Sequence, residues 1–485
     1  MIKIENPTPS KRAGLCALIP TLSAAAVLVV ALAAGIHLSA PAVHAQNPAP
    51  VSNQPHFVPS EPANSPMGVA FGIKPGRVSW AFDPNATSWD GTSVAPGWWD
   101  DSFTHPAVVE KMLADVILSV GDAKTVKESW NKIFTDFNRR HGRGEVGYTK
   151  GEKIVVKLNL NQVHDHGNGV KASYIAPQLV EALLRQLVEQ AGASPSDVTF
   201  YDAIRDVPST IFDRCTKAFP GVHFVDSTGT DGREKAVVDL TKPLVLSNGS
   251  ETLYFPTCVT QAQYMINFAG LKGHYMAGMT VCAKNHQGTI LKADGSTGAR
   301  DMHQFLAVEG STGRRGGPQK IQAMGDYNAL VDMNAHPQTG GKTVLYLIDG
   351  LYATKHNEYR LDASCKWQSA PFNNNWTSSV FASQDEVAID SVALDFLRNE
   401  PTISQIVAGP AVDNYLHELA LANNPPSKIV YDPDKSGKPL ASQGVHEHWN
   451  NAADRQYSRN LGTGPGIELV SLNPAAGTAV AVSSP

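Results

Sequence analysis

Cysteine is rare in this chain, and its spacing excludes one class of cofactor. Five of the 485 residues are cysteine, and no two of them form a Cys-x-x-Cys pair. Because iron–sulfur clusters are held by closely spaced cysteines of this kind, we expect no such cluster. Cys16 lies in an apolar N-terminal segment. The others are far apart and fit either up to two disulfides or small buried side chains: Cys215, Cys258, Cys282 and Cys365.

Charge is also modest, and several familiar catalytic motifs are missing. Charged residues make up 18% of the chain, the formal net charge is −5, and no basic stripe is present. Since nucleic-acid-binding surfaces are basic, we expect no nucleic-acid partner. The chain has no Gly-x-Ser-x-Gly elbow, no full phosphate-binding Gly-Lys-Ser/Thr loop and no His-Glu-x-x-His pair. These absences argue against the hydrolases, nucleotidases and zinc proteases that such motifs mark.

The N-terminus has the pattern of a secretory signal peptide. Three cations among the first twelve residues precede an Ala-rich apolar run at 15–36, and Val43-His44-Ala45 offers small residues to a signal peptidase. We therefore expect residues 1–45 to be removed and the protein to be exported, periplasmic or extracellular. Contact with the membrane would then occur only through this segment, before cleavage. The run is long enough to span a bilayer, so an uncleaved anchor is the alternative.

Composition divides the remaining chain into four segments. Residues 46–65 are rich in Pro, Asn and Ser, which predicts a flexible linker. Residues 66–150 predict an N-terminal extension with a helical part, residues 151–400 the core, and residues 401–485 an irregular C-terminal extension with a disordered end. Four of the eight tryptophans lie in the first part of the N-terminal extension, at 66–105, and predict an aromatic packing layer or a carbohydrate-stacking surface: Trp80, Trp89, Trp98 and Trp99.

Strand-like and helix-like segments alternate from residue 153 onward. This alternation predicts an α/β fold with a largely parallel, Rossmann-like sheet and helices on both of its faces. Apolar residues at helical spacing predict a further helix at 108–137. The expected strands are 153–160, 197–201, 222–225, 264–268, 343–348 and 378–382, and the expected core helices are 177–190, 208–219, 320–333 and 386–397.

The stretch from Gly270 to Gly288, GLKGHYMAGMTVCAKNHQG, concentrates polar side chains among glycines. It follows the apolar run 264–268, so the polar cluster begins where a strand is expected to end. Glycines permit close approach of a ligand to the backbone, and the side chains can donate protons, bind anions or ligate a metal. The candidate catalytic residues of this stretch are Lys272, His274, Lys284 and Asn285. The alternative is a solvated turn followed by an ordinary helix.

The same stretch carries a family resemblance. Leu271-Lys272-Gly273-His274, then Met-Thr-Val, then Ala283 to Gly288 resembles the signature of the family named domain of unknown function 362. Three more segments are similar to that family, and together they span about residues 150–400: Ile154 to Asn159, Leu345 to Gly350 and Ser383 to Asp390. The resemblance implies no general activity. Some relatives carry an iron–sulfur ferredoxin module, which the missing Cys-x-x-Cys pairs exclude here.

Polar residues stand at or just after the ends of most expected strands. Ligands of open α/β sheets bind at the carboxyl ends of the strands, so these residues define a candidate cleft. The candidate substrate-binding residues are Lys157, Asn159, Asn161 and Asn267. The candidate ligands of a hard cation are the aspartates Asp202, Asp349 and Asp385. Each aspartate could instead cap a helix or form a turn, and Asp385 stands directly before an expected helix.

Two pairs of histidines compete as metal sites. His164 and His166 lie in the loop after the first expected core strand and would face the cleft. His446 and His448 flank Glu447 in the irregular C-terminal extension, and we expect a surface or packing segment there.

These residues favour an enzyme acting on a small anionic molecule. Lys157, Lys272 and Lys284 would hold the anion, and His274 would be the general acid or base. The sequence identifies no cofactor, and a divalent metal is the candidate. The alternatives are a periplasmic binding protein that uses the same cleft without chemistry, and a structural surface protein.

Overall fold

A computed structural model describes residues 59, 61–164, 166, 171–298, 302–306, 321–403, 405–409 and 411–473. The expected signal peptide, most of the expected linker and the end of the tail lie outside these ranges. No helix in the described ranges is long and apolar enough to cross a membrane.

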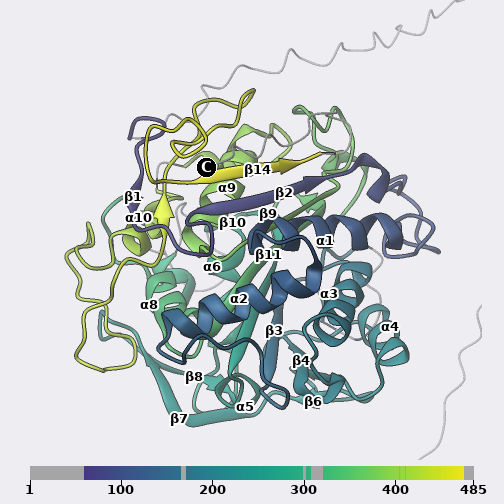
Figure 1. Cartoon of the computed structure of the whole chain (residues 1–485), viewed down its shortest axis with the longest axis horizontal. Coiled ribbons are helices and arrows are strands. Elements are labelled where there is room, and N and C mark those ends of the chain that lie inside the picture. The colour runs from purple at the N-terminus through teal and green to yellow at the C-terminus, as the bar shows by residue number, and fades with distance from the viewer. Residues whose placement is uncertain are drawn as a thin grey trace, which may run out of the picture. The chain divides into compact units, whose positions relative to one another are not determined.

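The core of the fold is a mostly parallel sheet (Figure 1). Its strands follow the spatial order β14 (Glu468–Leu472), β2 (Arg77–Phe82), β12 (Ser379–Ser383), β11 (Thr343–Thr354), β9 (Tyr264–His274), β3 (Ile154–Leu158), β4 (Val198–Tyr201), β5 (His223–Asp226) and β6 (Glu234–Lys235). A short strand, β10 (Gly278–Thr280), pairs with β9. Neighbours are parallel except where β12 or β10 takes part. The predicted α/β class is confirmed.

Continuous apolar runs explain why β3, β9 and β11 lie in the middle of the sheet. Nearly every residue of these strands is buried, as expected for parallel strands that are covered on both faces. Successive side chains point to opposite faces. Val155 therefore packs in one hydrophobic core, whereas Ile154 and Val156 pack in the other.

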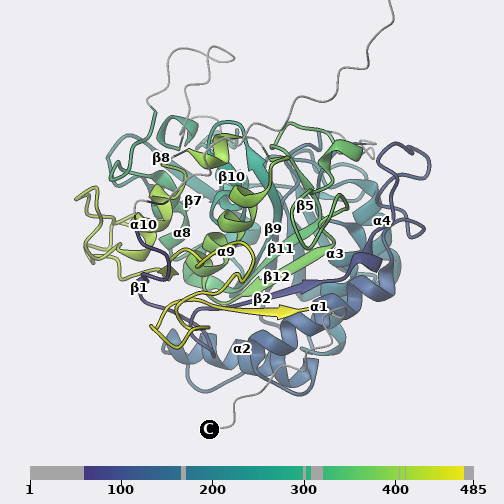
Figure 2. The ribbon, with the colours of Figure 1, turned by 90° about the horizontal axis from the view of Figure 1, so that it is seen from above.

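Helices cover both faces, as predicted (Figure 2). One core holds α1 (Pro106–Gly121), α2 (Val126–Arg140), α3 (Pro177–Glu189) and α4 (Ser209–Ala218). The other holds α6 (Cys282–Asn285), α8 (Ala329–Ala335), α9 (Glu386–Asn399) and α10 (Asn414–Ala420). A short helix, α5 (Thr257–Thr260), follows a hairpin of β7 (Val238–Val245) and β8 (Thr252–Pro256).

Two expected helices differ from those observed. The expected helix at 108–137 is interrupted, because Asp122 ends α1 in a left-handed conformation with φ of 47° and Thr125 caps α2 by accepting from Glu128 N at 3.2 Å. The expected helix at 320–333 starts later, at Ala329, where Asn328 caps α8 by accepting from Leu330 N at 3.0 Å. Local capping chemistry decides both boundaries.

Both extensions contribute strands that the sequence analysis did not predict. β2 from the N-terminal extension lies between β12 and β14, and β14 comes from the C-terminal extension. A second pairing joins the extensions directly, because β1 (Met67–Gly68) is antiparallel to β13 (Val445–His446).

The tryptophans of the N-terminal extension serve packing. Trp80, Trp89 and Trp98 are buried, and the ring of Trp89 stacks on that of Trp376 with centroids 5.5 Å apart. Buried indoles cannot stack on a sugar, so the carbohydrate-surface alternative fails for these three. The four described cysteines are free, which excludes the disulfide alternative, and three of them are fully buried.

Candidate functional site

Three neighbouring parallel strands bring predicted site residues to one edge of the sheet. β3 pairs with β9 so that Lys157 lies beside Asn267, and β11 pairs with β9 so that Asp349 lies beside Gly270. All of these side chains were expected in an open cleft. Instead, Lys157 is 1% exposed, Asn267 0% and Asp349 7%. The strand ends therefore carry a packed polar layer.

Lys157 has a full set of partners in this layer. Its Nζ lies 3.0 Å from Asp202 Oδ2, donates to Leu158 O at 2.6 Å and lies 3.2 Å from Asn285 Oδ1. Burial lowers the pKa of Lys157, and Asp202 opposes that effect. Gly288 permits the arrangement, because a Cβ there would lie 2.7 Å from Lys157 Nζ. Lys157 is therefore saturated by contacts within the protein.

Asparagines tie α6 to the strand ends. Asn285 Nδ2 donates to Asn267 Oδ1 at 2.8 Å, and Asn267 Nδ2 lies 3.0 Å from His286 Nε2 and donates to Cys282 O at 2.9 Å. Asn159 Nδ2 lies 3.3 Å from Asn285 Oδ1. Burial lowers the pKa of His286 to about 3, so its ring is neutral and its Nε2 can accept from Asn267.

Lys272 differs from Lys157, because no described residue accepts a hydrogen bond from its ammonium group. Lys272 is 1% exposed and lines a small cavity with room for about one water molecule. The other lining residues are Asn159, Ser173, Tyr174, Gly270, Leu271, Asp349 and Tyr352. Asn159 also has a buried Oδ1 without a hydrogen-bond partner. A cationic donor and an unused acceptor thus meet at one cavity.

Burial shifts the titration of both charged groups at this cavity. Burial lowers the pKa of Lys272 to about 7, an effect that Asp349 opposes and that Arg205 and Lys157 reinforce. Burial raises the pKa of Asp349 to about 6, although backbone N–H groups and Lys272 favour its charged form. Asp349 accepts from Ala176 N at 2.7 Å and from Leu351 N at 2.8 Å. The carboxylate is thus engaged by the backbone.

Lys284 adds a third buried cation. Burial, together with the charges of Lys272 and Arg205, lowers its pKa to about 7. Its Nζ donates to Gln287 Oε1 and lies 3.3 Å from His303 Nε2. Neither partner is an anion. In the polar layer three lysines, Lys157, Lys272 and Lys284, are therefore accompanied by two carboxylates, Asp202 and Asp349.

His274 is held in one tautomer. Its Nδ1 accepts from Met276 N and Ala277 N, both at 3.0 Å. Its Nε2 must then carry the proton in the neutral ring. Burial, reinforced by Lys284, holds the pKa of His274 well below its usual range. This geometry suits a hydrogen-bond donor better than the acid or base suggested by the sequence.

The residues of the polar layer all lie in one segment that matches a known protein family. Residues 154–395 match the family described as Domain of unknown function (DUF362). Through this segment the chain belongs to the DUF362 family. Comparison with curated proteins gives no match. The DUF362 segment supplies β3, β9, β11 and α6, and hence the whole polar layer described above.

Two predicted residues of the DUF362 segment lie away from the cavity. Asp385 follows β12, which runs antiparallel to β11, so it lies at the opposite edge of the sheet. There it caps α9, accepting from Ala388 N at 2.9 Å and from Phe71 N at 2.9 Å. The grouping of Asp385 with Asp202 and Asp349 as metal ligands is therefore wrong. Asn161 is half-buried, and its Nδ2 donates to Asn357 O at 3.0 Å.

The expected pairing of His164 with His166 is also not formed. His164 is exposed. His166 instead lies between two carboxylates, with Nε2 2.9 Å from Asp226 Oδ2 and Nδ1 2.9 Å from Asp231 Oδ2. His166 thus contacts Asp226 at the end of β5 and Asp231 after it, and its ring lies close enough to Asp206 and Asp226 for these three residues to hold a metal ion.

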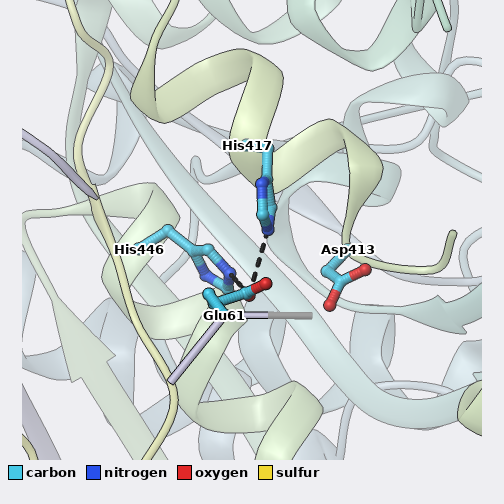
Figure 3. Close-up of side chains that lie close together, drawn as sticks. All are labelled: Glu61, Asp413, His417 and His446. Carbon is cyan, nitrogen blue, oxygen red and sulfur yellow. Dashed lines mark hydrogen bonds and ion pairs between the residues drawn. The ribbon is translucent and has the colours of Figure 1, made fainter. Parts of the chain in front are cut away.

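A different group of metal-ligating side chains converges outside the family segment (Figure 3). Its members are Glu61, Asp413, His417 and His446. The sequence analysis assigned His446 to a surface or packing segment and did not single out the others. Two local sequence patterns are consistent with this group. His446 and His448 alternate on an extended segment, so their side chains lie on the same side of the chain. Asp413 and His417 are four residues apart at the start of a helix, so they lie on one helix face. No local sequence pattern indicates Glu61.

Proposed function

We propose that the protein binds the anionic group of a small molecule at the cavity lined by Lys272. The observation that carries this proposal is a buried ammonium group without a hydrogen-bond acceptor, in a layer where cations exceed anions. Buried charges are normally paired. A carboxylate or sulfate oxygen would supply both the missing acceptor and the missing charge.

The size of the cavity restricts the ligand. Room for about one water molecule admits one oxygen of a carboxylate, sulfate or phosphate group. The remainder of the ligand would extend away from Lys272. The unpartnered Oδ1 of Asn159 lies at the same cavity. It could accept a hydrogen bond from a hydroxyl or a protonated acid on the ligand, which favours small hydroxy or acidic compounds.

We further propose acid–base chemistry by Lys272. A lysine with a pKa of about 7 exchanges its proton near neutral pH, which is the property required of a general acid or base. This assignment replaces His274, whose Nδ1 is occupied by two backbone N–H groups. A binding protein that uses the same cavity without chemistry is the second candidate, and substrate turnover distinguishes the two. Export of the mature protein is part of the proposal, on the pattern of residues 1–45.

Calorimetry with acetate and sulfate tests the binding step. Neither anion changes charge between pH 6 and 9, so any proton uptake comes from the protein. Anion binding should raise the pKa of Lys272, and at pH 8 we expect uptake of nearly one proton, read from the dependence of the heat on buffer ionisation enthalpy. At pH 6 Lys272 already carries its proton, so its share of the uptake should vanish, and only the smaller uptake by Asp349, whose pKa is about 6, should remain. Lys272→Met should abolish binding.

Lys342 provides a matched control. It is also a buried lysine, 9% exposed, but its Nζ donates to Val259 O, Ala262 O and Gln338 Oε1 at 2.7–2.9 Å, directly before β11. Lys342→Met should leave anion binding and proton uptake unchanged. If neither anion binds wild-type protein, or if binding survives in Lys272→Met, the cavity holds only water and the proposal fails.

A further inference from the structure

Segments on both sides of the core build a compact cluster of imidazoles and carboxylates that is separate from the Lys272 cavity. Glu61 comes from the expected linker, just before the N-terminal extension, and Asp413, His417 and His446 come from the C-terminal extension. One ligand atom from each lies within 4.8 Å of the others. In Figure 3 the ring of His417 projects from α10 toward Glu61, the ring of His446 lies beside it, and Asp413 faces them.

Three imidazole nitrogens surround one carboxylate oxygen. Glu61 Oε1 lies 3.1 Å from His417 Nε2, 3.4 Å from His446 Nε2 and 3.1 Å from His448 Nε2. His448 Nε2 also lies 3.4 Å from Asp413 Oδ2. Nitrogens that converge on one point from three directions match the approach of ligands to a metal ion better than three separate hydrogen bonds.

Two residues of α9 contact the ring nitrogens of His446 and His448 that point away from the cluster. His446 Nδ1 lies 2.8 Å from Ser391 Oγ, and His448 Nδ1 lies 2.7 Å from Asp395 Oδ1. These contacts fix the rings so that each Nε2 faces the cluster. Metal-binding histidines have outer partners of this kind at their second nitrogen. Arg398 Nη1 orients Asp413 in the same way, 2.9 Å from Oδ2.

Two buried atoms at the cluster make no well-aligned hydrogen bond. Asp413 Oδ1 has no partner, and His448 Nε2, although 3.1 Å from Glu61 Oε1, is not aligned for a hydrogen bond to it; Asp413 and His448 are each 2% exposed. Buried polar atoms of native proteins are rarely left in this state. A cation at the centre would satisfy both atoms at once.

We infer that Glu61, Asp413, His417, His446 and His448 bind one divalent first-row transition metal. Imidazole nitrogen suits iron, zinc, cobalt and nickel, whereas Mg²⁺ and Ca²⁺ prefer oxygen ligands throughout. The set contains no sulfur, which disfavours Cu(I). Five protein donors leave at most one position of an octahedron for a water or another ligand.

A metal ion bound at this site would cross-link the two ends of the described chain. Glu61 stands six residues before β1, which pairs Met67 with His446 itself. The ion would therefore connect the linker at Glu61 to the C-terminal extension, beside the pairing of β1 with β13 and against α9. This role does not depend on the Lys272 cavity, which belongs to other elements.

Metal analysis of the full-length protein tests the inference. We expect about one transition-metal ion per chain after purification without chelator. Removal with EDTA should lower the melting temperature, and Zn²⁺, Fe²⁺ under anaerobic conditions or Co²⁺ should restore it. Bound Co²⁺ should also give the weak visible bands of a five- or six-coordinate ion. Failure of all three metals to bind or stabilise the stripped protein would overturn the inference.

Variants locate the ion. Glu61→Gln and His417→Ala should each bind Co²⁺ at least 100-fold more weakly, and Ser391→Ala, which removes an outer partner, about 10–100-fold more weakly. His336→Ala is the matched control, because His336 is 2% exposed and bonds to Pro243 O at 3.2 Å, away from the cluster. Unchanged Co²⁺ binding in Glu61→Gln and His417→Ala would place the metal elsewhere and refute the site.

Discussion

Replacing Lys272 with methionine should make the unliganded protein more stable at neutral and acid pH. Methionine has a similar length and no charge, so the change removes a buried ammonium group that no described residue accepts a bond from. Replacing buried charges by apolar side chains is often neutral or stabilising. The effect should depend on pH, because only the charged form of Lys272 is disfavoured by burial.

The magnitude follows from the pKa of Lys272. Burial lowers it from 10.5 to about 7, and each pKa unit corresponds to about 1.4 kcal/mol, so the charged form costs the folded state roughly 5 kcal/mol. Below pH 7 both folded and unfolded chains carry the charge, and the full cost is present. Between pH 7 and 10.5 the unfolded chain binds more protons, so the cost falls by about 1.4 kcal/mol per pH unit.

Urea unfolding of both proteins at several pH values from 6.5 to 9.5 measures this cost. The difference in unfolding free energy between Lys272→Met and wild type should shrink by about 3 kcal/mol over that range. Any packing change caused by the methionine shifts the difference by a constant and does not alter its slope. Lys284 titrates in the same range and its pKa is lowered by Lys272, so the comparison is repeated in a Lys284→Met background, where this coupling is absent.

Lys157→Met supplies the contrast. Lys157 is equally buried but pairs with Asp202 at 3.0 Å, so its removal leaves an unpaired buried carboxylate. Loss of one partner of a buried pair costs about 3–5 kcal/mol, and this variant should be less stable than wild type at neutral pH. A difference for Lys272→Met that stays constant from pH 6.5 to 9.5 would show that Lys272 is already compensated, and the reasoning would be refuted.

Three further outcomes are expected. Asp390→Ala should lower stability by about 3 kcal/mol or more in urea unfolding, since Cys282 N, Ala283 N and Tyr415 Oη each lose an acceptor at 2.9 Å; Asp390→Asn should cost less. Gly288→Ala should cost about 1–3 kcal/mol, because its Cβ displaces the Lys157 ammonium; equal melting temperatures would contradict this. Sequencing of protein from its native host should begin at Gln46, and an intact Met1 in membranes would indicate an anchor.

The central sheet was predictable because its signals are local. The apolar runs of β3, β9 and β11 mark buried strands wherever they pair. β2 and β14 were missed, because a segment of five or six residues becomes a strand only by pairing with neighbours that are distant in sequence. Their partners are each other and β12, hundreds of residues away from β2.

The candidate site was predictable in part for a similar reason. Polar residues after parallel strands meet at one edge, and Lys157, Asp202, Asn267 and Asn285 indeed share one network. The burial of that network could not be foreseen, because it depends on how loops and α6 close over the edge. Asp385 was misplaced because residue types do not reveal that β12 runs antiparallel. The partnership of Glu61 with the C-terminal histidines depends on long-range packing alone.

The position of β2 has a consequence for the order in which the protein assembles. β2 is the first long strand to leave the ribosome, yet its two neighbours, β12 and β14, are the last of the sheet to be synthesised. During synthesis, residues 77–82 thus have no strand to pair with until about residue 383 has emerged, and this side of the sheet is finished only by residue 472. Such distant pairings slow folding. An apolar segment that waits unpaired is a natural target for a chaperone.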